Sequence, residues 1–289
     1  MLASLVKSAR PHQWIKNLFV LAPLVFARRI GDAVAVRRAA LATVAFCLLS
    51  SAVYLMNDIV DVDKDRAHPV KRHRPIASGS VPLGVARSLA AACALAGLGM
   101  TLSLGMSCAA SGAAYLALNL AYSFSLKKVA FIDVSCISLG FLLRVFAGSV
   151  AIPVDPSKWL LVCTALLSAL LGFGKRAHEL RVAGAEGAVQ RDVLGKYDLP
   201  TLQKLLAGLG VLTSVTYFAY TQSAHAHRFF GARPLVLTVP FVAFGVFRFT
   251  WIATRKLDAD SPTDSMMRDW PFVVNLCFYS VAILVLVSR

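Results

Sequence analysis

Long apolar runs separated by short charged segments constrain this 289-residue chain more than any other feature. With 57% apolar residues and a mean hydropathy of +0.67, the chain holds more apolar side chains than a soluble core of this size needs. Runs that suit a bilayer-crossing helix lie near residues 17–27, 38–56, 83–104, 107–126, 130–152, 158–174, 201–222, 235–254 and 271–288. The pattern predicts an all-α membrane protein with nine transmembrane helices, of which the first is short. We expect a single polytopic membrane domain over residues 1–289, because no linker separates the runs.

The net charge of +15 could indicate a nucleic-acid partner, but its distribution favours another explanation. The basic residues lie in short loops between apolar runs, where topology and binding of anionic lipid or phosphate explain them better. With the N-terminus inside, the inner segments carry 18 lysines and arginines and the outer segments carry 8. This asymmetry predicts a multi-pass protein of the plasma membrane with its functional loops on the cytoplasmic side and no nucleic-acid partner.

One of these inner segments, residues 57–79 (NDIVDVDKDRAHPVKRHRPIASG), contains four aspartates and five lysines or arginines. On a continuous helix, Asp58, Asp61 and Asp65 would share one face, where like charges repel. Mg²⁺ would explain the arrangement, because it takes oxygen ligands and shares them with substrate phosphates. Lys71 and Arg74 would then suit the phosphate itself. A solvated loop of mixed charge is the alternative, but carboxylates directly followed by cations favour a metal-phosphate site.

A second polar cluster, GKRAHEL at residues 174–180, opens the long inner loop after the sixth run. Lys175 and Arg176 lie four and three residues before Glu179, so the three side chains would share a face of a helix end. An ordinary helix-end ion pair fits this spacing equally well. Two such clusters on the same predicted side of the membrane favour a split site for a diphosphate.

The fifth run contains two ionisable residues, Asp133 and Arg144, about three helical turns apart on one stripe. Ionisable groups within a membrane span normally face an interior cavity and serve a function. A buried pair with a purely structural role is the alternative.

The chain resembles the UbiA superfamily of intramembrane prenyltransferases. Its motif NDxxDxxxD is intact at Asn57, Asp58, Asp61 and Asp65, and the tail HPxKxxRPxAxG runs from His68 to Gly79. The resemblance implies nine helices around a central cavity with aspartate-rich ends.

Within that superfamily the chain resembles the decaprenyl-phosphate phosphoribosyltransferases of the arabinan precursor pathway of cell-wall biosynthesis. The similar blocks are RPHQWIKN at 10–17, residues 51–79, LLRVFAGSVA at 142–151, SKWLL at 157–161 and GKRAHEL at 174–180. Family members that prenylate aromatic rings carry a second aspartate motif, DxxxD, where this chain has GKRAHEL. The resemblance therefore implies transfer of 5-phosphoribose from phosphoribosyl pyrophosphate to a polyprenyl phosphate, with release of pyrophosphate.

The same resemblance implies roles for individual residues. Mg²⁺ would be held by Asp58, Asp61 and Asp65, with Asn57 orienting them and Glu179 as a further carboxylate. Donor phosphates would contact Lys71, Arg74, Lys175 and Arg176, and the lipid phosphate would contact Lys16, Asn17 and Arg144. Asp58, Asp61, Lys175 and Arg176 are the catalytic candidates. The prenyl tail would lie in the apolar cavity, and the oligomeric state, including a homo-oligomer, stays open.

Two other functions are compatible with parts of the sequence. A conventional prenyltransferase would share the first aspartate motif but use a prenyl diphosphate donor and an aromatic acceptor. A transporter or lipid carrier would only bind anions, yet carboxylates on one side of the membrane provide no second gate for alternating access.

Overall fold

The computed structural model describes residues 1–183, 194–230, 235–255 and 262–288, and this part of the chain contains helices and no strands. In chain order the α-helices are α1 (Leu2–Ala9), α2 (Ala22–Phe26), α3 (Ala33–Val60), α4 (Val62–Ala67), α5 (Leu83–Ser103), α6 (Met106–Phe124), α7 (Ile132–Ala151), α8 (Lys158–Ala183), α10 (Leu199–Gln222), α11 (Ala224–Phe230), α12 (Val239–Arg255), α13 (Pro262–Arg268) and α14 (Trp270–Ser288). Short 3₁₀ helices are η1 (Pro11–Leu21), η2 (Lys71–His73), η3 (Leu126–Lys128), η5 (Leu194–Lys196) and η6 (Leu235–Thr238).

Six helices in the described residues are long and apolar enough to cross a bilayer, so the chain is a multi-pass membrane protein. They lie at Ala33–Val60, Leu83–Ser103, Ile132–Ala151, Lys158–Val182, Leu199–Gln222 and Leu235–Arg255. Three of the nine predicted spans are not among them, so the count of nine is not confirmed. The predicted spans at 107–126 and 271–288 are helical, as α6 and α14, whereas the predicted short first span is the 3₁₀ helix η1 followed by the five-residue α2.

By its contacts the chain forms two compact units, and each draws on separate parts of the sequence. Unit 1 comprises Met1–Leu24, Asp32–Ser123 and Leu143–Pro156. Unit 2 comprises Val25–Gly31, Phe124–Leu142 and Ser157–Arg289. The boundary falls within α7, and the single domain predicted from the sequence stays a prediction.

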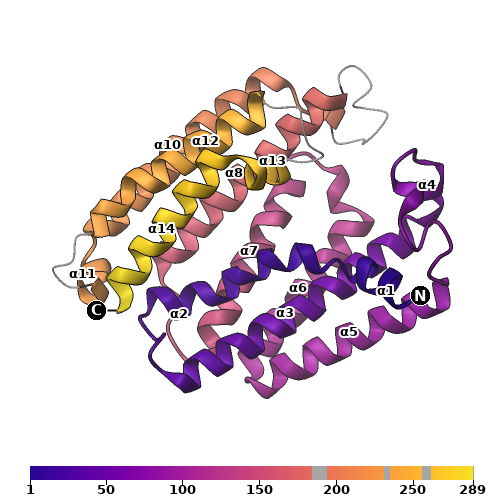
Figure 1. Cartoon of the computed structure of the whole chain (residues 1–289), viewed down its shortest axis with the longest axis horizontal. Coiled ribbons are helices and arrows are strands. Elements are labelled where there is room, and N and C mark those ends of the chain that lie inside the picture. Colours follow the sequence, from indigo (N-terminus) through magenta and orange to yellow (C-terminus); the bar gives the residue numbers. More distant parts are fainter. Residues whose placement is uncertain (184–193, 231–234, 256–261, 289) are drawn as a thin grey trace. The chain divides into compact units, whose positions relative to one another are not determined.

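Unit 1 is built on α3, which lies side by side with α5 and also packs against η1 (Figure 1). The carboxylate of Asp32 caps α3 by accepting hydrogen bonds from the amides of Val34 and Ala35. Gly105, with a φ of +124°, makes the short connection between α5 and α6, because glycine adopts this conformation without steric cost. Gly148 on α7 lets η1 approach closely, because an added Cβ would lie 2.0 Å from the carbonyl oxygen of Val20. This packing places η1 and the end of α1 against the long helix that carries the aspartate-rich stretch.

Unit 2 has its own apolar core, in which α10 packs against α8 and α12, and α12 packs against α14 (Figure 1). Its fully buried members include Leu170, Leu206 and Phe249. On α8, Gly172 faces Val134 of α7 so closely that an added Cβ would lie 2.6 Å from that side chain. The close approach of α7 and α8 brings Asp133 next to Arg176, two polar residues at the edge of this core.

Candidate metal and phosphate site

The aspartate-rich stretch does not form one continuous helix, because α3 and α4 meet at Asp61. Asp61 ends α3 and begins α4 with a φ of −93° and a ψ of 11°, so the helical phase changes there. The amide of Asp61 donates to the carbonyl of Asn57 at 2.9 Å in the last turn of α3, and the amide of Asp65 donates to the carbonyl of Asp61 at 2.8 Å in the first turn of α4. Asp58 and Asp65 are buried on either side of this junction, with 3% and 4% of their surface exposed.

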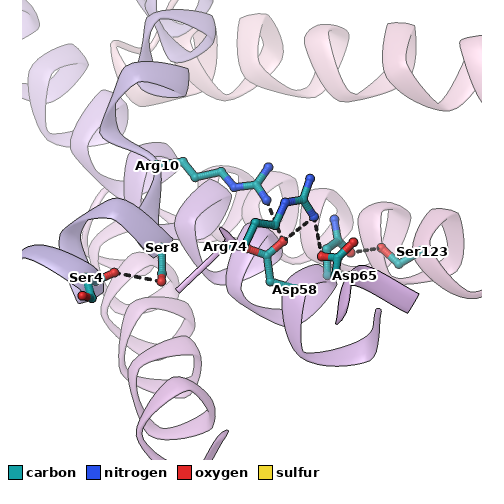
Figure 2. Close-up of polar contacts among 8 residues, drawn as sticks. Ser4, Ser8, Arg10, Asp58, Asp65, Arg74 and Ser123 are labelled. Atoms are coloured by element: carbon teal, nitrogen blue, oxygen red, sulfur yellow. Dashed lines mark hydrogen bonds and ion pairs between the residues drawn. The ribbon is translucent and has the colours of Figure 1, made fainter. Parts of the chain in front are cut away.

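Two arginines from distant segments of unit 1 converge on these buried carboxylates (Figure 2). Nη1 of Arg74 lies 3.1 Å from Oδ1 of Asp58 and 2.6 Å from Oδ2 of Asp65. Nη2 of Arg10 lies 2.6 Å from the same Oδ1 of Asp58. Asp58 and Asp65 thus contact one common cation, Arg74, and their binding of a metal ion stays a prediction.

The geometry fits a metal ion that shares its ligands with a substrate. In the described part of the chain, no three side chains of His, Cys, Asp or Glu come together to hold an ion unaided. The single nitrogen of Arg74 between Asp58 and Asp65 nevertheless shows that two carboxylate oxygens can meet at one cationic point. Mg²⁺ is typically bound by one or two carboxylates together with waters and substrate phosphates. The donor set is therefore suited to Mg²⁺ carried on a phosphorylated substrate.

The remaining residues of the stretch lie around this pair. The side-chain oxygen of Asn57 accepts a hydrogen bond from the hydroxyl of Ser123, which fixes the amide at the end of α6. Lys71 begins η2 and is exposed, and its backbone amide donates to Nδ1 of His68. Asp61 is partly exposed. Both Lys71 and Asp61 thus have access to water, and both belong to the same stretch as the buried carboxylates.

Arg144 and Asn17, two candidates for the lipid phosphate, contact each other inside unit 1. Nε of Arg144 donates to the side-chain oxygen of Asn17 at 2.8 Å, and Nη2 donates to the hydroxyl of Tyr115 at 2.9 Å. The amide nitrogen of Asn17 donates to Oγ of Ser50 at 3.1 Å. Asn17 is fully buried and Arg144 is 6% exposed, whereas the neighbouring Lys16 is partly exposed. Asn17 therefore orients a nearly buried guanidinium, which Tyr115 also contacts through its ring.

The second cluster lies in unit 2 and is far more enclosed. Nε of Arg176 lies 2.7 Å from Oδ2 of Asp133, and these two side chains are 1% and 0% exposed. Nη1 of Arg176 also pairs with the carboxylate of Glu179. Lys175 is different, because its side chain is 47% exposed and its Nζ lies 3.9 Å from Oε1 of Glu179. Lys175, Arg176 and Glu179 do share a helix end, but of these three only Lys175 and Glu179 are accessible from outside.

Tyr197 completes this second cluster. Its hydroxyl donates to Oδ1 of Asp133 at 2.7 Å and accepts the amide of Phe131 at 2.6 Å. Phe131 has a φ of +64°, a left-handed conformation that strains a bulky residue. Burial raises the pKa of Tyr197 to about 12, with the Phe131 amide opposing the shift and Asp133 adding to it. Tyr197 is therefore a neutral donor that holds the carboxylate of Asp133 in place.

Sequence reasoning did not single out Arg10, Ser123 or Tyr197 as site residues. The sequence did contain one indication for Arg10, since this residue begins the RPHQWIKN block that resembles known family members. Ser123 and Tyr197 are 66 and 64 residues from the partners they contact, Asn57 and Asp133. Nothing in the local sequence pairs them.

Comparison with known proteins identifies the family. The model of the UbiA prenyltransferase family matches residues 18–178. A protein of Mycolicibacterium smegmatis named decaprenyl-phosphate phosphoribosyltransferase is 42% identical over 203 residues, which cover 68% of this chain and 63% of that protein. The protein of the same name from Mycobacterium tuberculosis is 35% identical over 252 residues, which cover 85% of this chain and 83% of that protein.

Solved structures agree with this at the level of the fold. A UbiA homolog from Archaeoglobus fulgidus bound to GPP and Mg²⁺ has a TM-score of 0.74 at 18% identity, covering 99% of this chain and all of that one. At this identity the likeness concerns the fold alone, which is the one the sequence predicts. The family model spans more than half of the chain, and the mycobacterial relatives extend the similarity beyond it. The chain belongs to the UbiA prenyltransferase family.

Proposed function

We propose that this protein transfers 5-phosphoribose from phosphoribosyl pyrophosphate to a polyprenyl phosphate, such as decaprenyl phosphate, and releases pyrophosphate. The observation that carries the proposal is the convergence of two buried carboxylates, Asp58 and Asp65, on one cationic position. The names of the relatives from Mycolicibacterium smegmatis and Mycobacterium tuberculosis support the choice of donor and acceptor.

The reaction is a displacement at the anomeric carbon of the ribose. An oxygen of the lipid phosphate forms a bond to C1, and the bond from C1 to the pyrophosphate oxygen breaks with its electron pair going to pyrophosphate. A phosphate monoester is already an anionic nucleophile at neutral pH, so the protein needs neither its own nucleophile nor a strong general base. The protein's task is to orient the two anions and to stabilise negative charge on the leaving group.

The aspartate cluster of unit 1 is the proposed place for the leaving group. Asp58, Asp61 and Asp65 would hold Mg²⁺, with Asn57 fixed by Ser123 at their side. When bound, Mg²⁺ would neutralise charge on the departing pyrophosphate. Arg74 and Lys71 would bind the outer phosphate oxygens, because Arg74 already pairs with both buried carboxylates and Lys71 is an exposed cation three residues before it.

Two further groups of cations are proposed for the remaining phosphates. Lys175 is the accessible cation of its cluster and would contact the donor, with Arg176 held beside it by Asp133 and Glu179. Arg144, oriented by Asn17, would contact the lipid phosphate together with Lys16. The prenyl tail would lie among apolar helices, with the chemistry at the cytoplasmic face of the plasma membrane, as the charge asymmetry of the loops predicts.

A donor comparison tests the proposal. Purified protein in detergent is given a polyprenyl phosphate with radiolabelled phosphoribosyl pyrophosphate and Mg²⁺, and in parallel a prenyl diphosphate with 4-hydroxybenzoate. We expect labelled lipid in the first reaction, none when the Mg²⁺ is chelated, and no prenylated 4-hydroxybenzoate in the second reaction. Consumption of prenyl diphosphate, with phosphoribosyl pyrophosphate left intact, would replace the proposal by the conventional prenyltransferase reaction.

A further inference from the structure

Arg10 contacts the aspartate cluster from a segment that the proposed mechanism does not use. It lies between α1 and η1, and its Nη2 is 2.6 Å from Oδ1 of Asp58 (Figure 2). Its guanidinium carbon also lies 5.2 Å from the centre of the Tyr54 ring. Arg10 is thus held both by a carboxylate and by an aromatic face.

The backbone around Arg10 is built to hold this position. Arg10 has a φ of +53° and a ψ of +58°, a left-handed conformation that costs free energy for a residue with a side chain. The indole nitrogen of Trp14 donates to Oγ of Ser51 at 3.0 Å, and that hydroxyl donates to the carbonyl of Ala9 at 2.9 Å. Ser51, Tyr54 and Asp58 fall on one stripe of α3, three and seven residues apart. One face of α3 therefore receives the chain on both sides of Arg10.

The charges and the exposed fractions of these four side chains indicate how the cluster would respond to a metal ion. The side chains of Asp58 and Asp65 are 3% and 5% exposed, whereas those of Arg10 and Arg74 are 25% and 32% exposed. Two carboxylates and two guanidiniums make a neutral group of four. A divalent cation on the same carboxylates would repel both guanidiniums and leave the group with two positive charges in excess. An incoming pyrophosphate supplies the matching negative charge.

We propose that Arg10 is a further donor-binding residue, paired with Asp58 while the metal is absent and transferred to a pyrophosphate oxygen once the metal occupies the carboxylates. The inference rests on the proposed function for its substrate, although any pyrophosphate donor would serve. Arg10 competes with the metal for Asp58 when no donor is bound, and it contacts the pyrophosphate once the metal is bound. Its removal should therefore strengthen binding of the metal alone and weaken binding of the pyrophosphate. Metal and pyrophosphate binding are thereby coupled.

Two binding measurements on the purified protein in detergent test this. Mn²⁺ alone is titrated by electron paramagnetic resonance, and inorganic pyrophosphate is then titrated into Mn²⁺-saturated protein by calorimetry. For Arg10→Gln we expect Mn²⁺ alone to bind about tenfold more tightly and pyrophosphate about tenfold more weakly, the size of one charge-assisted contact. Arg10→Lys keeps the charge and should show smaller changes of the same signs. Lys7→Gln, which removes an exposed charge three residues away, should leave both affinities unchanged.

Other outcomes would overturn the proposal. Weaker binding of Mn²⁺ alone to Arg10→Gln would mean that Arg10 supports the metal ligands rather than competing with them. Unchanged pyrophosphate binding would leave Arg10 as a tether of α1 only. Thermal unfolding of each variant identifies a folding defect. If Arg10→Gln does not fold, the test rests on Arg10→Lys, for which we expect tighter binding of Mn²⁺ alone and weaker binding of pyrophosphate. Because inorganic pyrophosphate is the probe, the result does not depend on whether the donor carries phosphoribose or a prenyl group.

Discussion

The two carboxylate–arginine clusters of this protein consist of the same types of side chain but differ in the exposure of their arginines. In unit 1 the aspartates are buried, and the arginines that pair with them, Arg10 and Arg74, are a quarter to a third exposed. In unit 2 both Asp133 and Arg176 are almost completely buried, and Tyr197 covers the remaining carboxylate oxygen. An exposed cation can leave its carboxylate and be hydrated, whereas a buried one cannot leave without a large cost.

From this difference in exposure we expect a binding role for the unit 1 cluster and a structural role for the unit 2 cluster. The unit 1 cluster can exchange its arginines for another cation, as a metal and phosphate site requires. The unit 2 cluster is fixed, and it positions the helix end that carries Lys175 and Glu179. The same substitution, aspartate to asparagine, should therefore impair catalysis in one cluster and stability in the other.

The largest effect is expected from the unit 1 aspartates. Asp58→Asn or Asp65→Asn should lower turnover at least a hundredfold, because loss of a metal-bound charge costs several kcal/mol of transition-state stabilisation. The protein should stay folded, since Arg10 and Arg74 can turn to water. Initial rates with Mg²⁺ and gel filtration in detergent measure the two properties. Asp63→Asn is the matched control in the same stretch, because Asp63 is 89% exposed and pairs with the exposed Arg66 at 3.3 Å.

Asp133→Asn should show the opposite pattern. It leaves Arg176 buried without its charge partner, and breaking a buried pair of this kind typically costs ~3 kcal/mol or more of folding stability. We expect a clearly lower midpoint of thermal unfolding, followed in detergent by intrinsic fluorescence. An Asp133→Asn protein with normal stability and lost activity would mean that Asp133 acts on the substrate, and the contrast between the clusters would fail.

Lys175→Ala separates the exposed member of the unit 2 cluster from its buried pair. Lys175 is the exposed member of its cluster, so its removal should not affect folding. We expect the KM for phosphoribosyl pyrophosphate to rise about tenfold, the typical loss for one charge-assisted hydrogen bond, with little change for polyprenyl phosphate. Steady-state kinetics with each substrate varied in turn give both values. Equal increases for both substrates would remove Lys175 from the donor side.

Tyr197→Phe should have the smallest effect, a loss of about 1 kcal/mol of stability for the hydrogen bond to Asp133. Its pH dependence gives a second test. An ordinary tyrosine titrates near 10 and the folded-state pKa of Tyr197 is about 12, so the unfolded chain loses this proton first. The contribution is complete below pH 10 and is lost as the pH rises toward 12. The unfolding midpoints of the original protein and of Tyr197→Phe should therefore converge between pH 10 and pH 12. A constant difference between the two midpoints would mean that Tyr197 does not titrate in this range.

The parts of the site that depend on nearby residues were predictable from the sequence. Asp58, Asp65 and Arg74 lie within 16 residues of one another, and the sequence placed all three in one site. It did not show that the helix breaks at Asp61 or that Arg74 pairs with the two carboxylates. The long apolar helices were predictable for a similar reason, since hydropathy is local. The first predicted span, residues 17–27, was different: its hydropathy does not show that its first half belongs to the 3₁₀ helix η1, which packs against α3.

Contacts between distant segments were not predictable. Arg10 reaches Asp58 across 48 residues, and Asn17 reaches Arg144 across 127. Asp133 and Arg144 share a stripe of α7, yet Asp133 pairs with Arg176 in unit 2 and Arg144 with Asn17 in unit 1. The pattern of one helix shows that its polar residues need partners, but tertiary packing selects them.

The position of a bound metal ion would show whether the aspartates of unit 1 form the metal site. Crystals grown with Mn²⁺ and pyrophosphate would show the ion by its anomalous scattering. We expect Mn²⁺ within ligand distance of the carboxylates of Asp58 and Asp65, with Arg10 and Arg74 moved to the pyrophosphate and no ion at Asp133. An ion held by Glu179 or Asp133, with the arginines of unit 1 still on their aspartates, would contradict it.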